Sequence, residues 1–458
     1  MSKRWLAGVV MCAGLGSALA EVDSAPQRLS ATFLLERELA GGELHPYDIE
    51  LLAGDYVRVV FDQRGIDVIP VVRDPGGDVL FRNDTGEWGR EEASFIAPVT
   101  GIYRVDATPA RGDAPRGGYE IRVEALRPAL PADEERARVM DLTSQAYAAM
   151  APVLTASGGT ARGGTQADLT HARELYSQVL AEWQRQGDRP GEAFALTALA
   201  FIAGANDDFR GRLLYSRRAA PIWREVGNFY GEARAVKQAG VALDILGDSE
   251  GATSAFEQAL AIYRTIGNIN QQCLTLNDMA KSRGAAADLS GALSHAHEAL
   301  SLARQLGDAA LEARILETVA RFHLDLGENQ ICLDMCRRLL ELASRDEVFK
   351  ARITGMMGIA LARMGDRVEG LRALEESLDF WKKLNWRGFQ ARILIALGDL
   401  HVESGDLDRA RSVFELAAGK AGEICRLLSR HAIHRTFGGA GRSMHGADPR
   451  NDVRTGRC

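Results

Sequence analysis

Four arginines recur at one position of a repeating sequence pattern, and they are the residues best suited to chemistry in this chain. They are spaced by 80, 38 and 40 residues along the sequence. A guanidinium is planar and permanently charged, and its N–H donors match the two oxygens of a carboxylate. Two further cations are expected on the same helix face. The predicted site for an acidic peptide segment or a chain terminus consists of Arg234, Lys237, Arg314, Arg321, Arg352 and Arg392.

A second interpretation of these arginines is structural. Each could pair with a neighbouring acid, such as Glu232 or Glu312, and only solvate the surface. Exposed ion pairs of this kind contribute about 0–1 kcal/mol to stability. Both interpretations stay open at the level of the sequence.

No catalytic centre is predicted. His323 and His401 fall at an interior helix position where an aromatic residue is common, and Cys332 and Cys336 lie one helical turn apart, where they fit a packed helix core. The glycine-rich stretch GGTARGGT (158–165) follows no expected strand, so it matches neither a phosphate-binding nor a dinucleotide-binding loop. The sequence therefore predicts a protein that is not an enzyme and has no metal and no cofactor.

The candidate site lies in a region with a repeat of about forty residues. Glycine followed by Asp, Glu or Asn recurs at Gly187, Gly227, Gly247, Gly267, Gly307, Gly327, Gly365 and Gly405. Glycine permits the left-handed conformation that ends a helix, and the following polar residue can cap the next helix. A small residue also recurs where two helices should approach most closely, at Ala200, Gly240, Ala280, Ala320, Gly358 and Gly398. We expect six helical pairs after an irregular first pair, at 192–226, 232–266, 272–306, 312–345, 350–384 and 390–422.

This pattern resembles tetratricopeptide repeats, in a form longer than the usual repeat of about 34 residues. The resemblance implies an all-α superhelix over residues 132–422. Neighbouring pairs in such an array bury each other's apolar faces and leave an inner groove lined by the first helix of each pair. The groove implies a peptide or protein partner.

Residues 28–126 have a different character. Short runs rich in Val, Ile, Tyr and Phe alternate with Gly, Pro and Asp turns, which predicts a small antiparallel β-sandwich. The expected strands are 47–52, 55–63, 67–74, 78–84, 93–98, 101–108 and 119–126. Aspartates at the strand ends, such as Asp74 and Asp78, could suggest calcium, but we interpret them as turn residues.

Three segments carry a resemblance for this region: LLAGDYVRVVFDQRGIDVIPVVRDPGGDVLF (51–81), SFIAPVTGIYRV (94–105) and GGYEIRV (117–123). They resemble the pre-peptidase C-terminal type of bacterial β-sandwich, a non-catalytic module that flanks secreted enzymes. The order of an export signal, this sandwich and forty-residue repeats also resembles the front half of bacterial CHAT-domain proteins. The caspase-like peptidase module of that family follows the repeats, and here about thirty residues follow them.

The two ends of the chain carry separate predictions. Lys3 and Arg4 precede an apolar run that closes on Ala18-Leu19-Ala20, which predicts a signal peptide over residues 1–20 and export to the bacterial periplasm or beyond. Residues 424–458 hold seven Arg against two Asp, which indicates either a basic disordered arm or a shifted coding frame that replaced a longer catalytic protein.

Composition limits the class of partner. A formal net charge of −7 and an isoelectric point near 5.8 argue against nucleic acid. No apolar stretch of the mature chain has the length of a membrane span. Two hypotheses follow: an exported scaffold that binds a peptide or protein in its groove, or the regulatory part of a CHAT-type cysteine peptidase without its catalytic module.

Overall fold

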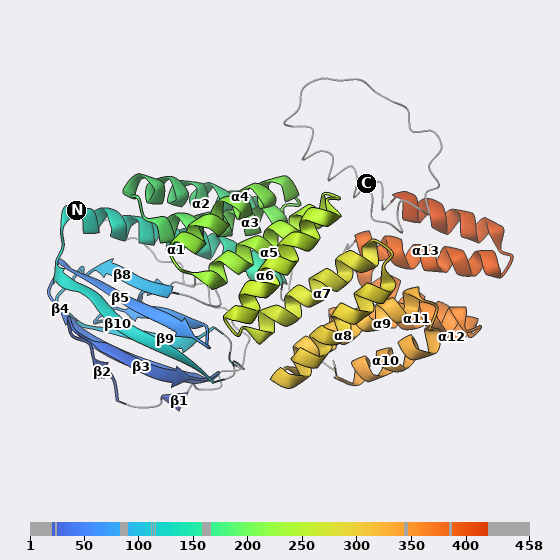
Figure 1. The fold of residues 1–458 in the computed structure, drawn as a ribbon, viewed down its shortest axis with the longest axis horizontal. Coiled ribbons are helices and arrows are strands. Elements are labelled where there is room, and N and C mark those ends of the chain that lie inside the picture. The colour runs from blue at the N-terminus through green and yellow to red at the C-terminus, as the bar shows by residue number, and fades with distance from the viewer. Residues whose placement is uncertain are drawn as a thin grey trace, which may run out of the picture. The chain divides into compact units, whose positions relative to one another are not determined.

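The computed structural model describes most of the chain between residues 21 and 419. Within that span it leaves out 23–24, 83–89, 111, 113, 115, 158–165, 343–346 and 384–386. The chain divides into two compact units after Tyr147, a β-rich unit followed by a helical unit (Figure 1). The predicted signal peptide and the predicted basic tail lie outside the described residues.

Two sheets form the first unit. Their strands are β1 (Glu21–Val22), β2 (Gln27–Arg28), β3 (Leu34–Leu39), β4 (Glu43–Leu51), β5 (Asp55–Arg64), β6 (Val68–Arg73), β7 (Val79–Arg82), β8 (Arg90–Ile96), β9 (Gly101–Pro109) and β10 (Gly117–Pro128). One sheet has the order β1-β4-β9-β6-β7 with β2 beside β4, and the other has the order β3-β10-β5-β8. The longer strands pair antiparallel, whereas the two-residue strands β1 and β2 run parallel to β4.

The core of this unit lies between the sheets. In β9, the buried side chains Tyr103 and Val105 alternate with exposed Ile102, as expected for a strand with one inner face. The Tyr103 ring lies 5.6 Å from the ring of Phe95 in the opposite sheet, measured between centroids. The hydroxyl of Tyr47 on β4 lies 2.6 Å from that of Tyr119 on β10. The predicted sandwich is therefore confirmed.

The seven expected strands correspond to β4–β10. The two-residue strands β1 and β2 are additions, and so is β3. Its sequence LLEREL contains residues that favour helices, which explains why no strand was predicted there. Pairing with β10 overrides that local preference. The turn interpretation of Asp74 is also confirmed, because its Oδ1 accepts hydrogen bonds of 2.9 Å from the backbone N–H groups of Gly76 and Asp78.

Paired helices form the second unit. Their bounds are α1 (Pro131–Ser157), which begins in the first unit, α2 (Gln166–Gln186), α3 (Arg189–Ala205), α4 (Phe209–Glu225), α5 (Phe229–Ile245), α6 (Ser249–Thr265), α7 (Ile269–Ala285), α8 (Leu289–Leu306), α9 (Ala309–Asp325), α10 (Asn329–Leu342), α11 (Glu347–Arg363), α12 (Arg367–Lys383) and α13 (Arg387–Glu403). Residues 407–419 form a further helix. The six expected pairs are confirmed.

The predicted turn chemistry produces these pairs. All eight glycines of the repeating motif have positive φ angles. The next residue then caps the following helix: Asp188 Oδ1, for example, accepts a hydrogen bond of 2.8 Å from the backbone of Gly191. Asn228, Asp248, Asn268 and Asp308 make the same cap after their glycines. Asp208 and Asp288 make it too, although they follow Asp207 and Ala287 and not a glycine.

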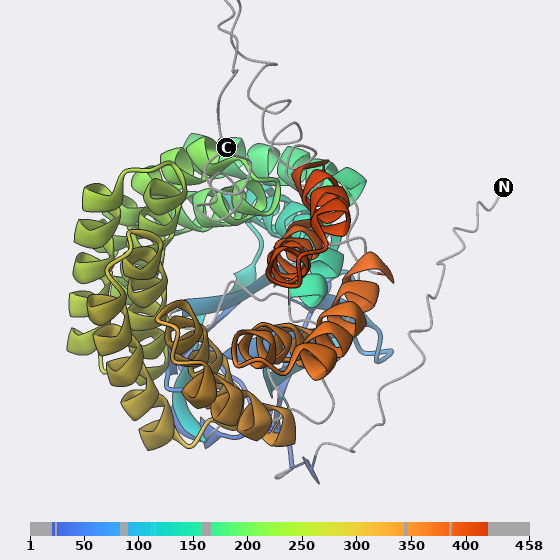
Figure 2. The same cartoon turned by 90° about the vertical axis from the view of Figure 1, so that its right-hand side faces the viewer.

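The small residues of the first helices lie at the expected close contacts. A Cβ atom on Gly398 would lie 2.5 Å from Phe414 Cε1, and one on Gly240 would lie 2.9 Å from Phe256 Cε1. Successive pairs pack through clusters of buried apolar side chains and turn about a common axis, so that α3, α5, α7, α9, α11 and α13 form the inner layer of this unit (Figure 2). The helical unit is a tetratricopeptide-type superhelix. None of the described helices combines the length and the apolar character that a membrane crossing requires.

Candidate functional site

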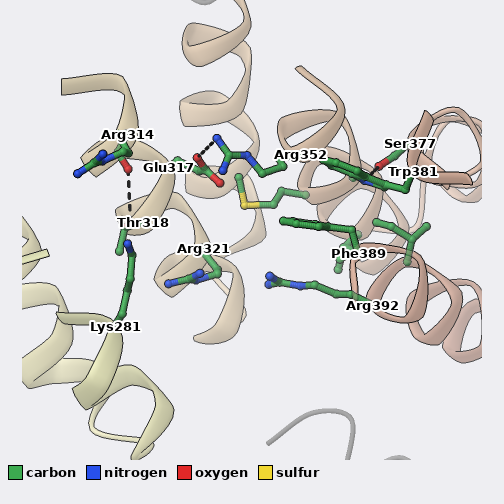
Figure 3. Close-up of a pocket in the computed structure, with 14 residues that line it drawn as sticks. Lys281, Arg314, Glu317, Thr318, Arg321, Arg352, Ser377, Trp381, Phe389 and Arg392 are labelled. Atoms are coloured by element: carbon green, nitrogen blue, oxygen red, sulfur yellow. Dashed lines mark hydrogen bonds and ion pairs between the residues drawn. The ribbon is translucent and has the colours of Figure 1, made fainter. Parts of the chain in front are cut away.

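A cavity of about 250 Å³ opens on the inner layer, between α7, α9, α11, α12 and α13 (Figure 3). Five cationic side chains and one carboxylate line it: Lys281, Arg314, Arg321, Arg352, Arg392 and Glu317. The other lining residues are Thr318, Gly355, Met356, Ile359, Ser377, Trp381, Phe389 and Ile393. We call this feature the cationic cavity.

The repeat brings the cations together. Arg314, Arg352 and Arg392 occupy equivalent positions on α9, α11 and α13, the first helices of three successive pairs. Lys281 and Arg321 share a second position, forty residues apart on α7 and α9. Figure 3 shows Arg392 reaching from α13 toward Arg321 on α9. A short repeated motif thus becomes a three-dimensional cluster of donors for anions.

Acids balance few of these charges. Glu317 Oε2 lies 3.1 Å from Arg352 Nη2, and these side chains are 19% and 31% exposed. Lys281 lies 3.8 Å from Asp278. Within the described part of the chain, no ion pair joins an acid to the three other cations, Arg314, Arg321 and Arg392. In addition, the buried Nε of Arg352 has no hydrogen-bond partner there.

The crowded positive charges affect one another. Burial lowers the pKa of Arg321, and the charge of Arg392 lowers it further, although the guanidinium stays charged. Burial also lowers the pKa of Lys281; Asp278 opposes that effect, and Arg314 and Arg321 add to it. An anion bound in the cavity would relieve this repulsion.

One wall of the cavity is apolar and well fixed. The rings of Trp381 and Phe389 stack with centroids 4.3 Å apart and planes inclined by 16°. Trp381 is fully buried, and its Nε1 donates a hydrogen bond of 3.1 Å to Ser377 Oγ, which donates one of 2.8 Å to the carbonyl oxygen of Ala351. The cavity can therefore contact an apolar group beside an anionic one.

Two of the six predicted site residues lie elsewhere. Arg234 and Lys237 are on α5, and Leu274 takes the equivalent arginine position on α7, so the row of arginines is interrupted between α5 and α9. Lys237 Nζ donates a hydrogen bond of 2.7 Å to Gln271 Oε1 and lies 5.9 Å from the centroid of the Tyr263 ring. The structure brings Arg314, Arg321, Arg352 and Arg392 into one site and leaves Arg234 and Lys237 outside it.

The two acids that the structural interpretation offered as examples pair with other arginines, although Arg352 does pair with an acid, Glu317. Glu232 pairs with Arg224 at 2.5 Å, and Glu312 pairs with Arg304 at 2.9 Å. In both cases the arginine comes from the second helix of the preceding pair. These acids therefore join successive repeats and do not neutralise the arginines of the inner layer.

Sequence reasoning missed Lys281, Trp381 and Phe389. Lys281 could have been found, because it stands forty residues before Arg321. Trp381 belongs to a second helix and Phe389 precedes the repeated arginine position, so the expectation of a site built on one helix face did not include them. Their contribution depends on packing between two pairs, which the repeat pattern does not show.

The other residues considered for chemistry have structural surroundings. His323 Nδ1 lies 2.5 Å from Glu328 Oε2, at the turn that follows α9, so it is not simply a packed core ring. The sulfur atoms of buried Cys332 and Cys336 are 3.9 Å apart, and the Cys332 thiol and burial raise the pKa of Cys336. In the described ranges, no three His, Cys, Asp or Glu side chains group as a metal site would require.

Solved structures share the helical fold. The apo form of RapI is 13% identical to this chain with a TM-score of 0.50, over 56% of this chain and 93% of that one. Aspartyl phosphate phosphatase F from Bacillus subtilis is 12% identical with a TM-score of 0.50, over 70% of this chain and 79% of its own. At these identities the likeness shows the fold alone, an array of tetratricopeptide type. No protein-family model and no curated protein matches the sequence, and the resemblance to pre-peptidase and CHAT-domain proteins stays a prediction.

Proposed function

We propose that the helical unit is a non-catalytic scaffold that binds an acidic segment of a peptide or protein partner in the cationic cavity. One observation carries the proposal: three arginines from successive repeats, Arg314, Arg352 and Arg392, line one cavity in which five cations face a single carboxylate. Arginine forks bind carboxylates with defined geometry. The neighbouring apolar wall offers a surface for a side chain of the same ligand.

The fold supports this mode of binding. A superhelix of helical pairs presents an extended inner surface, and its rigid helices hold the side chains in place before a ligand arrives. Pre-positioned donors lose less conformational freedom on binding than donors on a flexible loop. The proposal therefore needs no rearrangement of the repeats.

Fluorescence anisotropy with a labelled hexaglutamate peptide tests the proposal, with a hexaglutamine peptide as the uncharged comparison. We expect the protein to bind hexaglutamate at least about tenfold more tightly, with an affinity that falls as salt rises. A variant with Arg314→Gln, Arg352→Gln and Arg392→Gln should lose this preference.

The chain offers a matched control. Arg224, Arg264 and Arg304 also recur every forty residues, but on second helices and outside the cationic cavity. Changing these three to glutamine removes the same charge and should leave the preference for hexaglutamate in place. Equal binding of both peptides by the unchanged protein, or equal loss in both triple variants, would refute the proposal.

We also propose that this binding takes place after export. The motif that supports export is the basic and apolar sequence before Glu21, with Lys3, Arg4 and the small residues Ala18 and Ala20. Expression of the full chain in a Gram-negative host, followed by fractionation and N-terminal sequencing, should give a periplasmic protein that begins at Glu21. An unprocessed chain in the cytoplasm would contradict this part of the proposal.

A further inference from the structure

Glu317 is the one carboxylate in the lining of the cationic cavity. Its side chain is 19% exposed and pairs with Arg352 across the boundary between α9 and α11. The equivalent residue is Asn277 on α7 and Gly355 on α11, so an acid at this position is a property of α9 and not of the repeat. Figure 3 shows Glu317 and Arg352 joined at one side of the cavity.

The charge of Glu317 acts on the other cations as well. It opposes the lowering of the pKa of both Arg321 and Lys281, which means that it stabilises their charged forms. Among the lining residues, five cations against one carboxylate leave a formal excess of four positive charges, of which Asp278, outside the lining, offsets one at Lys281. Glu317 is thus a partial counter-ion for the cavity without a ligand.

A ligand carboxylate that approaches Arg352 meets this counter-ion first. If one carboxylate only replaces Glu317 on Arg352, one charge-assisted pair is exchanged for another, and little free energy is gained. A second carboxylate has more to gain, because no acid in the described structure pairs with Arg314, Arg321 or Arg392. The geometry favours ligands with several negative charges over those with one.

We infer that Glu317 is a built-in competitor that sets the charge requirement of the site. In this inference, which rests on the proposed function, the cavity selects peptide segments that carry at least two carboxylates. Glu317 is then a specificity-determining residue that competes for Arg352 and so weakens the binding of singly charged peptides. It acts through its ion pair with Arg352, and its charge also stabilises the neighbouring cations of the cavity.

The test uses Glu317→Gln in the full chain and labelled six-residue peptides that contain one, two or six glutamates, with glutamine at the remaining positions. We expect the unchanged protein to prefer the two-glutamate peptide over the one-glutamate peptide by about tenfold. In Glu317→Gln the one-glutamate peptide should bind about three- to tenfold more tightly, and the preference should shrink. Without peptide, the variant should unfold at a lower temperature because the cations lose their counter-ion.

Two comparisons make the result specific. Glu312→Gln removes a charge from the same helix, where Glu312 pairs with Arg304 outside the cavity, and should leave all three affinities unchanged. Glu317→Asp keeps the charge and should retain the preference of the unchanged protein. If Glu317 had only a structural role, Glu317→Gln would lower the unfolding temperature without raising the affinity for any of the three peptides.

The outcomes separate the two proposals. Weaker or unchanged binding of the one-glutamate peptide in Glu317→Gln, while the unchanged protein still selects hexaglutamate over hexaglutamine, overturns the role of Glu317 alone. If the unchanged protein does not select hexaglutamate, the proposed function fails as well. If Glu317→Gln does not fold, Glu317→Asp decides the question. Loss of the preference for the two-glutamate peptide over the one-glutamate peptide in Glu317→Asp overturns the inference, and an unchanged preference supports it.

Discussion

Nε of Arg304 lies 2.9 Å from Oε1 of Glu312, across the junction between two helical pairs. The same relationship recurs between Arg224 and Glu232. Glu312 and Glu232 precede the inner-layer arginines Arg314 and Arg234 by two residues. Each of these acids pairs instead with an arginine of the preceding repeat. These acids therefore form ion pairs between neighbouring repeats. Because they do not pair with the inner-layer arginines, the positive charge of the cationic cavity is not neutralised by them.

The junction pairs should matter little for stability. The side chains of Arg304 and Glu312 are 52% and 23% exposed, so solvent screens most of their attraction. Arg304→Gln should lower the free energy of unfolding by less than about 1 kcal/mol and leave binding of hexaglutamate unchanged. Urea unfolding and fluorescence anisotropy check both expectations, and a clear loss of peptide affinity would show that Arg304 belongs to the site.

An arginine inside the cavity should behave in the opposite way. Arg392 lies near Arg321 and lowers its pKa, so the two charges repel each other when no ligand is present. Arg392→Gln should raise the free energy of unfolding by about 0.5–1 kcal/mol while weakening peptide binding, as expected where function opposes stability. The urea midpoint should rise with an unchanged slope.

Arg264→Gln is the control for that measurement. Arg264 is paired with Glu298 at 2.6 Å on the outer helices α6 and α8, so its loss should be neutral or slightly destabilising. A decrease in stability on Arg392→Gln similar to that on Arg264→Gln would mean that packing of the Arg392 side chain outweighs charge repulsion.

The helix ends and the close contacts could be predicted because each depends on a residue type with a special backbone or a small volume. Gly187 and the other repeated glycines signal left-handed turns, and Gly240 or Gly398 signals a helix contact, without any knowledge of distant residues. Two turns with the same geometry carry no such signal. Asp207 and Ala287 have φ angles of 58° and 64°. Aspartate adopts this conformation more often than most residues without requiring it, and alanine gives no signal for it.

The cavity was harder to predict because it depends on relations between pairs. The sequence places Arg314, Arg352 and Arg392 at one position, but it does not show that Leu274 separates Arg234 from them in space. The stacking of Trp381 on Phe389 arises between α12 and α13, whose register is fixed only by packing. The positive charge of the site can be predicted from the repeat. Its extent and its apolar wall can be seen only in the folded superhelix.

The turn at Ala287 offers a direct test of backbone strain. An alanine in the left-handed region costs about 1–2 kcal/mol relative to glycine, because its Cβ atom crowds the backbone. Ala287→Gly should therefore raise the free energy of unfolding by about 0.5–1 kcal/mol despite the greater freedom of glycine in the unfolded chain. Ala286 has a φ of −80° and provides the control, since Ala286→Gly should only destabilise.

The contact at Gly358 should tolerate no side chain. A Cβ atom there would lie 2.8 Å from Leu374 Cγ, 3.0 Å from Leu374 N and 3.1 Å from Gly370 O. Because two of these atoms belong to the backbone of α12, relief requires the helices to separate, and Gly358→Ala should cost about 1–3 kcal/mol.

Gly204→Ala is the comparison for that prediction. A Cβ atom on Gly204 would meet atoms of the Arg212 side chain at 3.0 Å, and this long side chain can move aside. Alanine also favours a helix by about 1 kcal/mol over glycine, so Gly204→Ala should be neutral or stabilising. Equal loss of stability in the two variants would show that the helix contact at Gly358 is not the limiting feature.

Glu92 should make the stability of the first unit depend on pH. Burial raises the pKa of Glu92, but Arg136 on α1 and Arg58 on β5 more than offset that effect and hold the pKa below the usual 4.5. A carboxyl group whose pKa is lowered by folding stabilises the protein above its ordinary pKa, and that stability is lost as the pH falls through the folded value. Glu92→Gln should cost about 1–3 kcal/mol at pH 7, because it leaves two partly buried cations without their shared acid, although Arg58 keeps Glu124 at 3.5 Å.

The difference between Glu92→Gln and the unchanged protein should shrink as the pH falls below about 4.5, where the carboxylate of the unchanged protein also becomes protonated. Urea unfolding at pH 7 and at pH 4 or below measures this difference. Glu38→Gln, at an exposed position on β3, should show almost no effect at either pH. A difference that stays constant with pH would mean that Glu92 stabilises the unit through its shape and not through its charge, and that α1 is held to the sandwich by other contacts.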